Sequence, residues 1–90
     1  MEMLFLVWAL EFPGGYCDGD FSLKGNKMSI LSCAIACRDS PFFTFANGAS
    51  KCDARGYCRC DCYTGVNGKC VKKTDNEYTA FKITDPRKPG

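Results

Sequence analysis

The chain has 90 residues, the length of one small domain. Eight residues are Cys and none is His, which excludes Ser-His and Cys-His catalysis as well as histidine metal sites. The formal net charge of +2 is too small to indicate a nucleic-acid binder. A Cys content this high in a short chain is typical of secreted domains built on disulfides, and the even count favours complete pairing.

The N-terminus carries an apolar run, residues 3–10, with the length of the hydrophobic core of a secretory leader. The run is too short to cross a bilayer. Glu2 stands where a leader normally has Lys or Arg, and no clear cleavage site follows. We predict an atypical leader over residues 1–15, a mature domain over 16–84 and a flexible tail or linker over 85–90. The alternatives to the leader are an apolar N-terminal strand of the mature fold and a remnant of cloning or of the gene model.

Further along, the pattern predicts one helix and several short strands. A short strand is expected near residues 16–21. Ser29 is a suitable helix N-cap, the apolar positions 30, 33, 34 and 37 have helical spacing, and Pro41 stops the helix soon after Asp39. Strand-favouring segments follow at 42–46, 57–63 and 78–83, separated by Gly-containing loops. The sequence therefore predicts an α+β fold, in which one short helix packs on a small antiparallel sheet.

The cysteines are spaced so that they can join the helix to a strand. Cys33 and Cys37 lie on one helical face, about 6 Å apart along the axis. The Cys residues at 58, 60 and 62 lie on one strand face, about 6.7 Å per step. Two parallel disulfides can therefore connect the two elements, although the spacing leaves open which strand Cys pairs with which partner. The third strand Cys is expected to pair with Cys52, and Cys17 with Cys70. The predicted disulfide residues are Cys17, Cys33, Cys37, Cys52, Cys58, Cys60, Cys62 and Cys70.

Metal binding is the alternative use of these cysteines, because the run Cys58-x-Cys60-x-Cys62 offers three thiolates. Zinc sites normally use Cys pairs separated by two residues, and this chain has no such pair. We therefore expect structural disulfides and no metal. A scaffold of this size also offers little cleft for a substrate, so we expect neither catalytic activity nor a cofactor.

Basic residues gather between positions 51 and 73, where six Lys or Arg stand against two Asp. We expect them in loops and on the outward face of the 57–63 strand. They are either ordinary surface charge or a site for an anionic partner, such as a sulfated glycan, an acidic protein or membrane headgroups. The two tyrosines that flank the strand can stack on a sugar ring or simply pack. The candidate ligand-binding residues are Lys51, Arg55, Tyr57, Arg59, Tyr63, Lys69, Lys72 and Lys73.

Over residues 15–84 the layout resembles the PAN/apple domain. The resemblance is carried by Ser29 with the Cys33-x3-Cys37 helix, by PFFTF at 41–45, by GYC at 56–58 and by YTAFKI at 78–83. It implies a C-x3-C helix on a curved antiparallel sheet with paired terminal strands, in an extracellular, non-catalytic module that binds protein or carbohydrate. Family members commonly have a Cys before the aromatic strand that pairs with the second helical Cys. Phe42 or Phe43 stands there in this chain, so Cys37 needs a partner from the 58–62 run.

Cysteine-stabilised α/β peptides, which include defensins and scorpion toxins, are the second group that the chain resembles. They too join a C-x3-C helix to a C-x-C strand, and GYCRC at 56–60 is similar to their signature. That resemblance implies action on membranes or channels. Such peptides usually end soon after the C-x-C strand, whereas 28 residues follow Cys62 here. The preferred prediction is a secreted module whose partner is an extracellular glycan or protein, with no nucleic-acid partner and no transmembrane segment.

Overall fold

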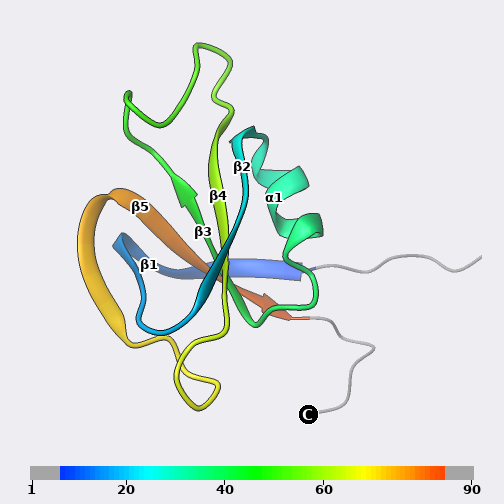
Figure 1. Cartoon of the computed structure of the whole chain (residues 1–90), viewed down its shortest axis with the longest axis vertical. Helices are drawn as coiled ribbons and strands as arrows, with labels where there is room; N and C mark the ends of the chain where they lie inside the picture. The colour runs from blue at the N-terminus through cyan, green and yellow to red at the C-terminus, as the bar shows by residue number, and fades with distance from the viewer. Residues whose placement is uncertain (1–6, 85–90) are drawn as a thin grey trace, which may run out of the picture.

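The computed structural model describes residues 7–84, which form one short helix on a five-stranded sheet (Figure 1). Every strand pairing is antiparallel, and the order across the sheet is β1-β5-β3-β4-β2. The predicted α+β class is therefore confirmed. The predicted tail and the first six residues of the predicted leader lie outside the described residues. The elements are β1 (Val7–Cys17), β2 (Phe21–Met28), α1 (Ile30–Ala36), β3 (Phe42–Ala46), β4 (Cys58–Tyr63) and β5 (Lys72–Thr84).

Helix α1 begins where the sequence predicts. The Ser29 hydroxyl accepts a hydrogen bond from the Ser32 N–H at 3.1 Å, which satisfies one of the free donors of the first turn. The helix ends at Ala36, with Cys37 as its C-cap. Seven residues are too few for a stable isolated helix, so tertiary contacts must hold it. No helix within residues 7–84 combines the length and the apolarity needed to cross a membrane.

The main core lies between α1 and the facing side of the sheet. Phe43, at the centre of β3, is fully buried. Its ring stacks on Phe81 of β5 at 5.0 Å between centroids and meets the edge of Trp8 of β1 at 6.4 Å. Cys33 and Ala34 of the helix pack against the same cluster. The strands predicted at 42–46 and 57–63 thus supply the middle of the fold.

Strand β1 belongs to the sheet over residues that the sequence assigned to a leader. Trp8 lies opposite Ile83, and the pairing with β5 continues to the partners Cys17 and Lys72. The sheet begins at Val7, nine positions before the predicted start of the mature domain at residue 16. Removal of a leader during export stays a prediction.

The short strand expected at 16–21 is wrong, because a turn interrupts it. Tyr16 and Cys17 end β1, whereas Phe21 begins β2. Between them Gly19 adopts a positive φ of 104°, which favours glycine, and the Asp18 carboxylate accepts a hydrogen bond from the Gly19 N–H at 3.0 Å. Strand β2 itself, with one Gly and two Lys among its eight residues, has no strong strand pattern and is held by its pairing with β4.

The sheet curls, so that its face away from α1 is also partly covered. Tyr16 of β1 lies 6.1 Å from Tyr63 of β4 and 6.3 Å from Tyr78 of β5, between ring centroids, although β1 and β4 are not neighbours in the sheet. A second buried cluster of Cys17, Phe42 and Tyr63 forms there. Strand β4 is consequently buried on both faces for part of its length, which its alternating sequence did not predict.

Candidate functional site

Two parallel disulfides join α1 to β4. Cys33 pairs with Cys60 and Cys37 with Cys62, and the corresponding Cα atoms are 5.5 and 5.3 Å apart. The matched spacing of the helical and strand cysteines predicts this arrangement, and the structure resolves the pairing that the sequence left open. The remaining two disulfides are Cys52–Cys58 and Cys17–Cys70, and none of the eight cysteines is free.

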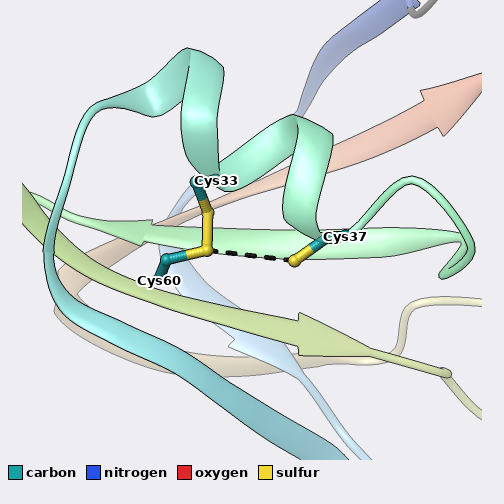
Figure 2. Close-up of side chains that lie close together, drawn as sticks. All are labelled: Cys33, Cys37 and Cys60. Atoms are coloured by element: carbon teal, nitrogen blue, oxygen red, sulfur yellow. Dashed lines mark hydrogen bonds between the residues drawn. A yellow bond between two sulfur atoms is a disulfide. The ribbon is translucent and has the colours of Figure 1, made fainter.

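The two helix–strand disulfides bring three sulfur atoms close together, as Figure 2 shows for Cys33, Cys37 and Cys60. The Cys37 and Cys60 sulfurs are 3.8 Å apart. Neither carries a proton, because both are in disulfides, so this approach is a van der Waals contact. A metal site needs thiolates, and disulfide sulfurs carry no negative charge. In the oxidised protein this buried cluster is therefore structural.

The 47–57 loop leads into the start of β4 (Figure 1). Three of the predicted basic residues belong to this region, and each forms an ion pair with a carboxylate: Lys51, Arg55 and Arg59. The Lys51 ammonium is 3.2 Å from Glu77, and its pKa is raised by this contact. The Ser50 hydroxyl donates to the same carboxylate at 2.8 Å, and together Ser50 and Lys51 lower the pKa of Glu77. Lys51 also lies 5.8 Å from the centroid of the Tyr78 ring. The Lys51 ammonium thus has both a carboxylate and an aromatic ring as neighbours.

Arg55 and Tyr57 stand on a rigid loop that the Cys52–Cys58 disulfide closes. The Arg55 guanidinium lies 4.5 Å from the centroid of the Tyr57 ring and 3.1 Å from Asp53. The Asp53 carboxylate also accepts the backbone N–H groups of Arg55 and Tyr57, at 2.9 and 3.0 Å. Desolvation acts to raise the Asp53 pKa, but these hydrogen bonds outweigh it and lower the pKa. Both candidate side chains are exposed.

Arg59 is fixed by a buried carboxylate. Its Nε and Nη2 donate to the two Asp61 oxygens at 2.9 and 3.2 Å, and these bonds raise the pKa of Arg59. Asp61 is completely buried, whereas 31% of the Arg59 side chain is exposed. The guanidinium therefore neutralises the carboxylate and still reaches the surface.

Tyr63 cannot offer its ring to a ligand, because only 6% of the residue is exposed. It packs against Phe21 and Tyr16, which agrees with the packing alternative. Burial raises its pKa to about 12, so the phenol stays protonated at neutral pH. The Thr44 hydroxyl oxygen on β3 is also buried, and it has no hydrogen-bond partner among residues 7–84.

The other three basic residues lie at the opposite end of β4. The 64–71 loop follows that end of β4 (Figure 1) and contains Lys69, and Lys72 and Lys73 begin β5 shortly after the disulfide-bonded Cys70. All three are exposed, and none makes an ion pair with a residue between 7 and 84. Lys72 lies 5.2 Å from the centroid of the Phe12 ring. The basic stretch is therefore two separate groups rather than one continuous surface.

Residues that the sequence did not indicate also contribute to this region of the surface. A surface depression of about 240 Å³ lies beside the first of these groups. Lys51 and Arg59 line it together with Asn26 and Lys27 of β2 and with Ser50. No local sequence signal connects residues 26–27 with residues 50–59, because their proximity depends on how β2 pairs with β4.

Comparison of the chain with protein-family models, with curated proteins and with solved structures found no match. The function is therefore inferred from the side chains themselves.

Proposed function

We propose that this protein is an extracellular, non-catalytic binding module of the PAN/apple kind, and that its ligand is an anionic carbohydrate. Four disulfides in a domain of this size are compatible with an oxidising compartment, and disulfides of this kind are rare in the cytosol. The curled antiparallel sheet, its paired terminal strands and the C-x3-C helix are consistent with that family.

The observation that carries the proposal is the placement of the cations in two groups at opposite ends of β4. A compact anion can meet only one of these groups, whereas an extended polyanion can contact both. Sulfated glycans have repeated anionic groups along a stiff chain and suit this spacing. The exposed Tyr57, held against Arg55, adds a ring face that can stack on a sugar.

The proposal is tested by chromatography on immobilised heparin. We expect K69E/K73E to elute at clearly lower salt than the wild type, because it removes cations from the group that has no carboxylate partner. K24E/K82E is the matched control, since it makes the same charge change at exposed positions outside both groups and is expected to elute later than K69E/K73E. Identical elution of the two variants would mean that retention reflects net charge alone, and the proposed surface would be wrong.

A second candidate function is that of a defensin-like or toxin-like peptide. It is favoured by one observation, the pairing of both helical cysteines with alternate cysteines of a single strand. Leakage of anionic vesicles or block of channel currents at micromolar protein would support it. The absence of both effects, together with retention on heparin, would favour the binding module.

A further inference from the structure

The depression beside the first basic group is built by a bulge in β2. Gly25 lies opposite Cys60 and Met28 opposite Cys58, so the two residues Asn26 and Lys27 face the single residue Arg59. A β-bulge of this kind redirects side chains from their usual alternation. Here it brings an amide and an ammonium group to the guanidinium of the neighbouring strand.

The other wall is a turn fixed to the same residue. The backbone N–H of Arg59 donates to the Lys51 carbonyl at 3.1 Å, and the Lys51 N–H donates to the Gly48 carbonyl at 2.9 Å. These backbone hydrogen bonds hold the turn that carries Ser50 and Lys51 beside Arg59. Three segments that are distant in the sequence thus converge on one small surface site.

Every lining side chain of this depression can donate a hydrogen bond, and none is acidic. Arg59 uses two of its N–H groups on Asp61, which leaves the others available while its orientation is fixed. Lys27 is exposed and makes no ion pair within the described part of the chain. The Glu77 carboxylate competes with a bound anion for this site, since it already pairs with Lys51 and accepts the hydrogen bond of the Ser50 hydroxyl.

We propose that this depression binds one sulfate group. Lys27, Lys51 and Arg59 supply the positive charge, and the Asn26 amide adds a neutral donor, whereas the Ser50 hydroxyl donates its one proton to Glu77. A tetrahedral oxyanion suits donors that converge from several sides, and the volume of about 240 Å³ fits a small group rather than a drug-sized ligand. The assignment to a glycan sulfate rests on the proposed function, whereas binding of the ion itself does not.

The test is a titration of the whole oxidised chain with sodium sulfate at constant ionic strength, followed by two-dimensional NMR of backbone and side-chain N–H groups. We expect saturable shifts of the Asn26 side-chain amide and the Arg59 Nε–H. K27E is expected to weaken sulfate binding about tenfold or more. K82E makes the same charge change on β5, at an exposed position outside both basic groups, and is expected to leave the affinity unchanged. Lys27 has an exposed side chain without an ion-pair partner, so K27E is expected to fold, and its spectrum checks this.

The outcomes separate this inference from the proposed function. Saturable shifts in the depression that K27E abolishes support the inference, even if heparin does not retain the protein. The absence of saturable shifts there, or equal weakening by K27E and K82E, overturns it, even if heparin retention persists through the second basic group. Inorganic phosphate at pH 7 forms a second arm of the experiment. Tighter binding of phosphate at the same residues would overturn the assignment to sulfate.

Discussion

The guanidinium of Arg59 and the carboxylate of Asp61 stand two residues apart on β4 and are joined by two hydrogen bonds, of 2.9 and 3.2 Å. Residues at this spacing lie on the same face of a strand. Asp61 is fully buried, so its charge depends on Arg59 for compensation. The same guanidinium also lines the depression, and the ion pair thereby links the stability of the fold to the candidate site.

The first prediction concerns this pair. R59Q leaves a buried carboxylate without its cation and is expected to lower the free energy of unfolding by about 3 kcal/mol. In R59Q/D61N the charge is also removed, so the double variant should be more stable than R59Q alone. Urea unfolding at neutral pH measures both. If R59Q and R59Q/D61N lose the same stability, the burial of a charged Asp61 is not what makes Arg59 necessary.

The second prediction concerns β1. A chain that begins at Tyr16 lacks most of this strand, including Trp8, whose ring contacts Phe43 in the core. It also leaves most of β5 without its pairing partner. We expect it to unfold at a clearly lower temperature than a chain that begins at Val7. Differential scanning calorimetry of the two chains is the measurement. A leader that ends at residue 15 predicts the opposite result, equal stability of the two chains.

The third prediction ranks two disulfides by the length of chain that they close. Cys17–Cys70 spans 53 positions and Cys52–Cys58 only 6. The chain-entropy argument gives losses of about 4 kcal/mol for C17A/C70A and about 2 kcal/mol for C52A/C58A. Unfolding by guanidinium chloride tests the order. A larger loss for C52A/C58A would show that the short loop stabilises the native state through its own contacts.

The fourth prediction is a pH dependence of sulfate binding. The hydrogen bond from Ser50 and the ion pair with Lys51 hold the pKa of Glu77 below its ordinary value of 4.5. Their contribution to stability is therefore present above that value and is lost as the pH falls through the lowered pKa. Protonation of Glu77 also removes the negative charge that pairs with Lys51. The other groups that act on the Lys51 ammonium are Asp75 and Tyr78, and the phenol of Tyr78 is neutral because its pKa is raised.

Sulfate binding should consequently become tighter as the pH falls through the Glu77 pKa. At pH 7, E77Q should bind sulfate a few times more tightly than the wild type and should lose this pH step. E11Q is the matched control, because it changes the charge equally on β1 and should leave the affinity as it is. Weaker binding by E77Q at pH 7 would contradict the competition between Glu77 and the anion. Titration calorimetry at several pH values provides the comparison.

The parts of the fold that local sequence determines were predicted well. Ser29 caps the helix, the aromatic run of β3 forms a central strand, and the cysteine spacings of α1 and β4 match across the disulfides. Strand β2 was missed because its Gly and charged residues carry no strand signal. It exists because β4 offers it a pairing edge.

The candidate site was predicted only in part, for the same reason. Lys51 and Arg59 could be selected because they belong to a run of basic residues. Asn26 and Lys27 could not, since only the β2–β4 register and its bulge bring them near Arg59. Proximity in the sequence was also misleading, because the 47–57 loop and the 64–71 loop, which share the basic stretch, lie at opposite ends of β4 (Figure 1).

The most direct test of the account is titration calorimetry of the oxidised protein with a heparin octasaccharide and with its desulfated counterpart, at low and at physiological salt. We predict saturable binding of the sulfated chain, an affinity that falls as the salt rises, and no binding of the desulfated chain. Equal binding of the two oligosaccharides, or an affinity for the sulfated one that does not depend on salt, would contradict recognition through the basic groups.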